Sequence, residues 1–434
     1  MAKQDFLDRL YAQVANEEDA RTCTDISDAA CREVPGNFFR IISANTLTKI
    51  GDLLINPKTV LAWLITAVGA PSYLAALLVP IRESGSLIPQ LMIGALVRRY
   101  PIRKGFWTLG AALQGIAVLA MAAAVWLLEG MQAGLTIIGL LVLFSISRGF
   151  CSVAMKDVQG KCIPKSRRGR LTGLSATLSG AITFALSLAI FRGGEDDPSM
   201  AFYGALLASA GVAWLVAAGV FFTVDEYPGA SEGGNNAFKE ALASLGLLKT
   251  DAPFRRFVIT RALLMASSLA SPFLVLVAQE QASLPLLLGS FVLASSLAST
   301  VSATVWGYMA DTSSRNVMVR GGGLAAVVCL LAGGLAAWGP QADWLHWLYP
   351  LAFFVLAIAH AGVRIGRKTY MVDMAGGTKR TDYTAVSNTV IGVLLLAVGG
   401  ISAGVALLGN DLALLVLGGM GAAGGVSARL LKDV

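Results

Sequence analysis

Long apolar runs separated by short polar breaks fill the chain from about residue 58 to its end. A helix needs about 20 apolar residues to cross the hydrocarbon core of a bilayer, and the runs are close to that length. The predicted spans are 58–79, 82–98, 105–128, 132–153, 171–191, 200–223, 256–278, 286–309, 319–338, 345–366, 385–408 and 411–428. The pattern predicts an all-α polytopic membrane protein of twelve helices in two sets of six.

The longest polar stretch after the N-terminal region separates the two sets. It runs from Asp225 to about Asp251 and includes Pro228 and the polar run 231–236. This composition is typical of a flexible linker, with a short surface helix predicted over 237–248. The expected parts are an N-terminal segment (1–56), an N-terminal bundle (57–224), a linker (225–254) and a C-terminal bundle (255–434).

The first 56 residues are polar but hold apolar side chains at helical spacing between Phe39 and Leu54. This pattern predicts a helix that lies along the cytoplasmic interface of the membrane. Asn56 and Pro57 then suit the N-cap and first position of the first span. Residues 1–35 contain no apolar segment of the kind found in signal peptides, so the N-terminus is expected in the cytosol.

Composition and charge agree with a membrane protein. Hydrophobic residues make up 55% of the chain and charged residues 14%, whereas soluble proteins have about 25% charged residues. The net charge of +7 comes from basic loops that follow every second span, at 98–104, 156–170, 255–256, 315–320 and 367–380. The positive-inside rule places these loops and both termini in the cytoplasm. Basic residues confined to loops do not indicate nucleic-acid binding.

Cofactor and metal chemistry find little support in the sequence. The five cysteines include no CxxC pair, and the two histidines are His346 and His360, so neither a disulfide framework nor a metal site is predicted. No Walker motif is present to couple transport directly to ATP. We expect no cofactor.

The two halves repeat at a nearly constant spacing. Gly307 follows Gly94 by 213 positions, and the pairs at a spacing of 212 are Arg148 with His360, Lys156 with Lys368, Arg168 with Arg380, Thr172 with Thr384 and Ser175 with Ser387. Pro71 and Pro272 match at 201, which predicts a longer first loop in the second half. Such repeats predict two bundles about a pseudo-twofold axis along the membrane normal.

One motif resembles a known family. The segment from Gly307 to Arg315, with Asp311 between them, resembles the loop signature of the major facilitator superfamily. The equivalent first-half segment keeps Gly94 and a basic end but has Arg98 where the family has an aspartate. The resemblance implies the two-bundle fold and secondary transport by alternating access.

The same resemblance implies a cytoplasmic gate. Gly307 would allow close helix approach, and Asp311 would meet a helix N-terminus or an arginine when that side closes. The alternative is that Asp311 solvates a loop. The expected gate residues are Gly94, Arg98, Asp157, Arg168, Gly307, Asp311, Arg315 and Arg380.

Four ionisable residues fall inside predicted spans, namely Arg148, Arg261, His360 and Arg364. A charge within a span costs roughly 2.5–3.5 kcal/mol on insertion scales and marks a functional site by default. His360 and Arg364 are one turn apart and can face one cavity. A cationic cavity suggests an anionic or zwitterionic solute. Alternatively, Arg261 and Arg364 extend to the cytoplasmic interface.

The segment around Arg82 and Glu83 is a further candidate. Pro80, Gly85 and Pro89 would kink or break a helix there, and broken helices supply binding groups in transporters. Glu83 is the first choice for a proton-accepting carboxylate, although Arg82 and Glu83 could instead form an ion pair in water. Asn388 could line the pathway or face the outer solvent.

These features predict a secondary transporter of a small, anionic or zwitterionic solute, with protons as a candidate coupling ion. The expected setting is a bacterial inner membrane, with the protein monomeric in the bilayer. The alternative is a non-transporting assembly factor or receptor with the same fold. A membrane enzyme is disfavoured because no nucleophile and base are clustered at membrane depth.

Overall fold

The computed structural model describes residues 11, 28–192, 199–229, 231, 245–281, 285–340, 344–374 and 379–433, and these are almost entirely helical. The first half contains α2 (Asp28–Arg32), α3 (Val34–Leu54), α4 (Val60–Ala67), η1 (Ser72–Leu74), α5 (Ala75–Leu87), α6 (Gln90–Arg98), α7 (Lys104–Leu127), α8 (Gly130–Cys162), α9 (Lys165–Arg192) and α10 (Met200–Phe222). The second half contains α12 (Leu247–Thr250), α13 (Ala252–Leu264), α14 (Ala266–Leu269), α15 (Ser271–Gln281), α16 (Pro285–Thr312), α17 (Ser314–Trp338), η2 (Leu345–Trp347), α18 (Leu348–Met374), α19 (Lys379–Ala406) and α20 (Asn410–Arg429).

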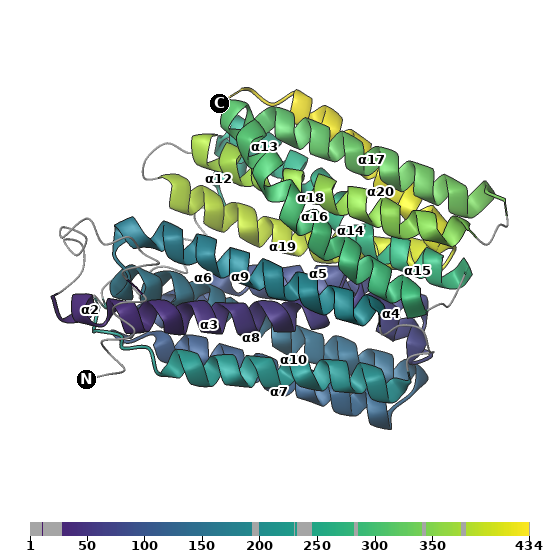
Figure 1. Ribbon diagram of the computed structural model, residues 1–434. Coiled ribbons are helices and arrows are strands. Elements are labelled where there is room, and N and C mark those ends of the chain that lie inside the picture. Colours follow the sequence, from purple (N-terminus) through teal and green to yellow (C-terminus); the bar gives the residue numbers. More distant parts are fainter. Residues whose placement is uncertain are drawn as a thin grey trace.

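The two halves lie side by side with their long helices running along a common direction (Figure 1). Helices α2 and α12 and the C-terminus lie at one end, on the left of the view, and we call this the terminal end. The turn between α4 and η1 and the C-terminal end of α15 lie at the other end, which we call the opposite end.

Helix packing repeats between the halves. In the first half α7 packs against α8 and α10, and α10 packs against α3; in the second, α17 packs against α18 and α20, and α20 packs against α13. The halves meet where α5 packs against α19 and α9 against α16. These two contacts are equivalent when the halves are exchanged, as a pseudo-twofold axis requires. The twelve-helix, two-bundle fold predicted from the sequence is confirmed.

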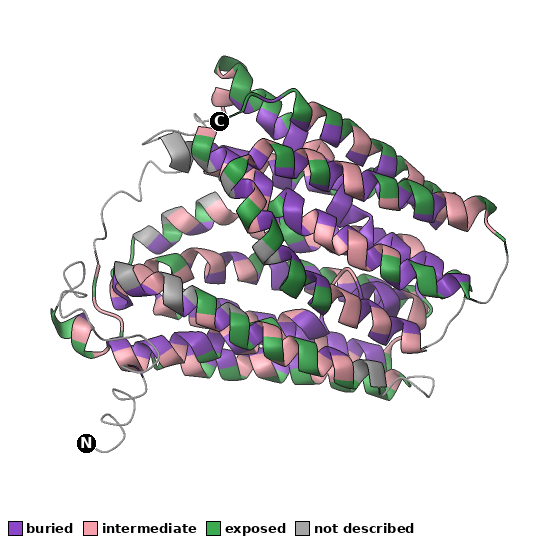
Figure 2. Cartoon of the chain, turned by 45° about the horizontal axis from the view of Figure 1, so that its top comes forward, coloured by how far each residue is buried: buried purple, intermediate pink, exposed green. Residues whose placement is uncertain are grey.

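Apolar side chains cover the outside of both bundles, so the protein is an integral membrane protein. Buried positions gather between the helices, and exposed positions face outward (Figure 2). Among the described residues, eight helical segments are long and apolar enough to span a bilayer. The exposed apolar side chains of α7, α10, α17 and α20 include Leu109, Ile116, Trp126, Val212, Val216, Phe222, Val327, Leu331, Val416 and Val426.

The first span differs from the prediction. Helix α3 is not an interfacial helix, because it packs lengthwise against α9 and α10 and buries Phe38 and Ile41 completely. After a break at residues 55–59 the chain continues as α4. The first span therefore covers 34–67 and the second 72–98, so the predicted spans 58–79 and 82–98 are misplaced. Residues 34–56 belong to the first bundle rather than to a separate N-terminal segment. The polar residues Lys49 and Asp52 interrupt the apolar run.

This revision also corrects the repeat. Pro71 lies in the turn before η1, whereas Pro272 lies inside α15, in the middle of the second half's first span. Their match at 201 positions was therefore wrong. The break at Pro57 precedes Pro272 by 215 positions, so the register of the repeat continues through the first helix. Asn56 lies in this break, and the N-cap of α4 is Thr59.

Two smaller predictions concern the cysteines and the linker. Cys31 is disulfide-bonded, a single bond that the sequence did not predict, whereas Cys151, Cys162 and Cys329 are buried free thiols. Most of the predicted linker helix, 237–248, lies outside the described residues.

Candidate functional site: a charged cavity between the halves

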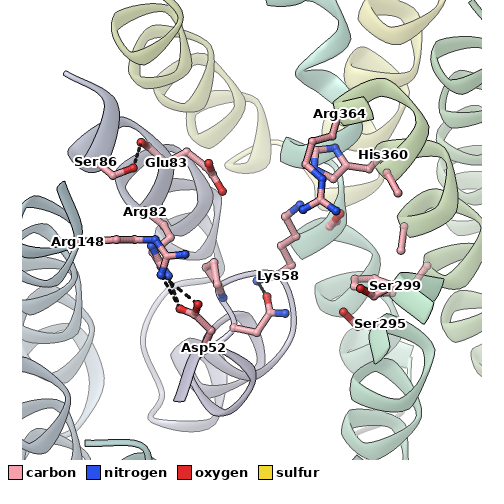
Figure 3. Close-up of a pocket in the computed structure, with 16 residues that line it drawn as sticks. Asp52, Lys58, Arg82, Glu83, Ser86, Arg148, Ser295, Ser299, His360 and Arg364 are labelled. Carbon is pink, nitrogen blue, oxygen red and sulfur yellow. Dashed lines mark hydrogen bonds and ion pairs between the residues drawn. The ribbon is translucent and has the colours of Figure 1, made fainter. Parts of the chain in front are cut away.

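A cavity of about 320 Å³ lies between the two halves and is lined by residues from both (Figure 3). Both halves supply its walls, so any solute bound there contacts both. The residues with polar side chains that line it are Asp52, Asn56, Lys58, Arg82, Glu83, Ser86, Arg148, Ser271, Ser295, Ser299, His360 and Arg364.

Asp52 of α3 joins three helices of the first half. Its Oδ1 accepts hydrogen bonds from Arg82 Nη2 of α5 at 2.6 Å and from Arg148 Nη1 of α8 at 2.8 Å. Lys49 Nζ lies 3.9 Å from Oδ2, one turn earlier on α3. The Arg82 guanidinium also lies over the Phe144 ring, 4.7 Å from its centroid. The carboxylate thus fixes two arginines at the cavity wall.

The break between α3 and α4 positions Lys58. Asn56 Oδ1 accepts the Lys58 backbone N–H at 2.9 Å, and Pro57 cannot donate to a helical carbonyl. The turn directs Lys58 across the cavity toward His360 and Arg364 of α18 (Figure 3). Lys58 therefore brings a first-half cation beside the second half.

Glu83 faces the same cavity without a cation bound to it. Its side chain is exposed, and within the described part of the chain it forms no ion pair. Ser86 Oγ donates to the Glu83 backbone oxygen rather than to its carboxylate. An Arg82–Glu83 ion pair in water, the alternative considered from sequence, is wrong because Arg82 is buried and bound to Asp52.

The second half contributes His360 and Arg364. His360 Nδ1 lies 3.1 Å from Ser267 Oγ, and Arg364 is exposed to the cavity one turn further along α18. Arg364 therefore lines the cavity, which does not fit the alternative that it only extends to the interface. The structure brings together five of the residues singled out from sequence, which are Arg82, Glu83, Arg148, His360 and Arg364.

Arg261 and Asn388 lie outside the cavity. Arg261 is 6% exposed and donates to Ser387 Oγ at 2.6 Å and Asn388 Oδ1 at 3.0 Å. Asn388 Nδ2 reaches Gln90 Oε1 of the first half at 3.4 Å. Arg261 is thus a buried link within the second half, and its predicted extension to the interface is wrong.

The cavity has an excess of positive charge. Lys58, Arg82, Arg148 and Arg364 face two carboxylates, Asp52 and Glu83, which leaves two positive charges in excess with His360 neutral. Uncompensated charge at membrane depth is costly. A bound anion would offset it, and a guanidinium can hold a carboxylate or phosphate through two hydrogen bonds.

Asp52 and Lys58 are central to this site, and neither was predicted from the sequence. Both fell in the segment interpreted as an interfacial helix and its junction with the first span. Lys49 precedes Arg261 by 212 positions, the spacing of the repeat, and this match could have placed α3 in the bundle. Among the described residues, no group of three or more histidine, cysteine or acidic side chains is arranged to hold a metal ion.

Three of the expected gate residues, Asp157, Arg168 and Arg315, have partners within their own halves. Asp157 pairs with Arg103 and with Lys161, at 2.9 Å to the latter. Arg168 donates to backbone oxygens at the end of α8, including that of Gly160. Arg315 pairs with Asp433 at 2.9 Å. The side chains of Arg98, Asp311 and Arg380 lie outside the described residues, so the gate remains a prediction.

Close contact between the halves occurs toward the opposite end. A Cβ on Gly399 of α19 would overlap Pro80 Cγ of α5. Thr66 donates to Gln279, and the Ser187 and Ser296 hydroxyls are 2.7 Å apart. In contrast, a Cβ on Gly94 or Gly307 would meet no described heavy atom within 4 Å, so the described residues show no close helix approach at Gly307. Because of these contacts, the two halves are closed against each other at the opposite end.

Comparison with known proteins agrees with this geometry. The profile of the Major Facilitator Superfamily matches residues 44–400. A mutant of the nucleoside transporter NupG is 12% identical over 91% of this chain and 99% of that chain, with a TM-score of 0.71. A D-xylose-proton symporter is 13% identical over 91% and 97%, with a TM-score of 0.68. A search of curated protein sequences returns no match.

Two pseudo-symmetric six-helix bundles with a charged cavity between them define a membrane transporter. The profile match covers most of the chain, including every residue that lines the cavity. The chain belongs to the Major Facilitator Superfamily and is a secondary transporter.

Proposed function

We propose that this transporter moves a small anionic solute by alternating access and that the charged cavity is its binding site. The observation that carries the proposal is the excess of two positive charges in a cavity at membrane depth. Cations come from both halves, so an anion held between them stabilises the state in which the halves close around it.

Three cations are placed to bind the anion. Lys58 and Arg148 belong to the first half and Arg364 to the second. The Arg148 side chain is 30% exposed, whereas that of Arg82 is 10% exposed and held between Asp52 and Phe144. Arg148 can therefore turn from Asp52 to an incoming anion while Arg82 stays with Asp52.

Glu83 is the proposed proton acceptor. It faces the cavity and has no ion-pair partner among the described residues. Protonation of Glu83 would remove a negative charge from the cavity and favour entry of an anionic solute. A proton and an anion would then cross together, so a proton gradient could drive accumulation of the solute.

We further propose that the protein resides as a monomer in a bacterial inner membrane with its terminal end in the cytoplasm. The basic loops support this orientation, because 98–104, 156–170 and 315–320 all lie at the terminal end. The linker from Asp225 to Asp251 joins the halves there. Reporter fusions after Leu431 and in the 339–344 loop test the orientation, and activity of a periplasm-specific reporter at Leu431 would contradict it.

The experiment that tests anion binding is thermal unfolding of the purified protein with acetate, phosphate and amino-acid anions against neutral and cationic analogues. A ligand that binds the folded state raises the unfolding temperature. We expect stabilisation by anions that is lost in Arg148→Gln. Stabilisation by neutral or cationic solutes alone would contradict the proposal. Binding without flux in sealed vesicles would instead favour a receptor with the same fold.

A further inference from the structure

A second compartment of about 610 Å³ adjoins the charged cavity. The two compartments share Asp52, Asn56, Ser295, Ser299 and Arg364, so they form one continuous space. The second compartment extends between α3, α8, α9 and α16 toward the terminal end. Its volume is within the range of about 300–1,000 Å³ that is typical of small-molecule sites.

The walls of this compartment differ in chemistry from those of the first. Among the described residues that line only the second compartment, Lys49 is charged and most of the others are neutral and polar. The neutral polar residues are Asn45, Gln159, Ser175, Ser179, Thr183 and Ser296. A dense cationic site therefore adjoins a wall of hydroxyl and amide groups.

The hydroxyl groups lie on facing helices. Ser175, Ser179 and Thr183 are spaced by four residues and share one face of α9. Ser295 and Ser299 share a face of α16, which packs against α9. Both halves thus contribute to the polar wall, as both contribute to the charged cavity.

These groups can bind a hydroxylated solute. Thr183 donates to the Gly180 backbone oxygen at 3.1 Å, and Ser179 donates to that of Ser175, yet each hydroxyl keeps lone pairs that can accept from a ligand. Within the described residues, Ser295 and Ser299 form no hydrogen bond to the protein. An apolar solute would leave these groups without partners, which is unfavourable.

We propose that the solute is an anionic polyol, such as a phosphorylated sugar alcohol or a sugar acid. Its anionic group binds Lys58, Arg148 and Arg364, and its hydroxylated part lies against α9 and α16. Ser295 and Ser299 stand where the two compartments meet and select the first hydroxyl groups beyond the anion. This inference rests on the anion-binding function proposed above and adds the chemistry of the rest of the solute.

Pairs of ligands that differ only in hydroxyl groups test the inference. Equilibrium binding to the purified full-length protein is measured for gluconate against hexanoate, for sorbitol 6-phosphate against hexyl phosphate, and for sorbitol alone. We expect the hydroxylated member of one pair to bind at least about tenfold more tightly than its partner, because each added hydrogen bond contributes modestly. The pair that shows the preference distinguishes phosphate from carboxylate.

Variants of Ser295 and Ser299 test whether these two serines produce the preference for the hydroxylated anion. The double variant Ser295→Ala/Ser299→Ala should weaken binding of the hydroxylated anion about tenfold and leave hexanoate or hexyl phosphate unchanged. Ser209→Ala is the matched control, because Ser209 is an exposed serine of α10 that bonds only its own helix. The ligand pairs on the unaltered protein decide the question even if the double variant does not fold.

The outcomes separate the two proposals. Equal binding of the hydroxylated and deoxygenated anions would overturn the polyol inference, since the second compartment would then be a hydrated vestibule, and would leave anion binding intact. Binding of sorbitol as tightly as sorbitol 6-phosphate would overturn the proposed anion function, because the anionic group would then contribute nothing to affinity.

Discussion

At the scale of single residues, the charged cavity depends on one carboxylate bound by two guanidinium groups. Asp52 holds Arg82 at 2.6 Å and Arg148 at 2.8 Å, and its own side chain is 18% exposed. Removal of one partner from such a cluster leaves a cation without its counter-ion in a partly dehydrated place. Asp52 is therefore both a structural residue and a competitor of the incoming anion.

Asp52→Ala should lower the free energy of unfolding by about 2 kcal/mol, less than a fully buried ion pair because the cavity admits water. The measurement is thermal unfolding in detergent. The double variant Asp52→Ala/Arg82→Met should recover part of the loss, because the buried guanidinium is then absent as well. A double variant that is less stable than the sum of the single changes would contradict this role.

Glu83→Gln should abolish the acceleration of solute uptake by an imposed pH gradient while downhill exchange continues, because the amide cannot accept the coupled proton. Uptake into proteoliposomes with and without the gradient gives this comparison. Glu280→Gln is the control, since Glu280 accepts a hydrogen bond from Asn410 at 2.5 Å and does not line the cavity. Retained acceleration in Glu83→Gln would place the proton on another group.

At the scale of elements, a carboxylate that follows the sixth span of each half binds residues near the start of the third span of that half. After α10, the buried Glu226 carboxylate accepts the backbone N–H groups of Arg103 and Lys104 and the Lys161 ammonium at 2.6–2.9 Å. After α20, Asp433 binds Arg315 and Ser313 at 2.9 Å. Arg103 and Arg315 are 212 positions apart, and each lies at the start of the third span of its half (α7 and α17). The contact between a third span and the carboxylate after the sixth span is therefore part of the repeat.

The two contacts should differ in strength. Glu226→Ala should lower the free energy of unfolding by about 2 kcal/mol, because it leaves the N-terminal backbone donors of α7 without their buried acceptor and removes one partner of Lys161. Asp433→Ala should lower it by less than about 1 kcal/mol, since the Asp433 side chain is 53% exposed and surface ion pairs contribute little. Equal losses of unfolding free energy in the two variants, measured by thermal unfolding, would contradict the claim that burial makes the Glu226 contact the stronger one.

The sequence correctly predicted the position of those helices that face the lipid. Helices such as α7, α10 and α20 expose apolar side chains to the membrane, and their boundaries agree with the predicted spans to within a few residues. Helix α3 was misplaced because it is enclosed by other helices and carries Lys49 and Asp52 toward the cavity. A helix buried in protein needs no continuous apolar run.

The candidate site was predictable in part for the same reason. Arg148 and His360 stood out as ionisable residues within apolar runs. Lys58 lies next to a polar segment, so its charge did not distinguish it from its neighbours in the sequence. The pairing of Arg82 with Asp52 rather than with its neighbour Glu83 depends on how α3 packs. Sequence spacing alone does not contain that information.

At the scale of the whole molecule, the contact between α5 and α19 holds the opposite end closed. A Cβ on Gly399 would overlap Pro80, whereas a Cβ on the adjacent Gly400 meets no described heavy atom within 4 Å. Gly399→Val should therefore favour the state open at the opposite end. A thiol at Ser299→Cys should then react faster with an impermeant reagent added from that side, and Gly400→Val should leave the rate unchanged. No change in Gly399→Val would mean that another contact closes this end.

Charge displacement in adsorbed proteoliposomes tests the central claim most directly, because binding of a charged solute in the cavity displaces charge even where a proton that crosses with the solute makes complete transport electroneutral. We predict that at least one small anion from a panel of carboxylates and phosphates evokes a current in the unaltered transporter and that Arg148→Gln loses it. A current evoked only by neutral or cationic solutes, or an anion current that Arg148→Gln retains in full, would contradict the claim that the cavity between the halves carries an anion.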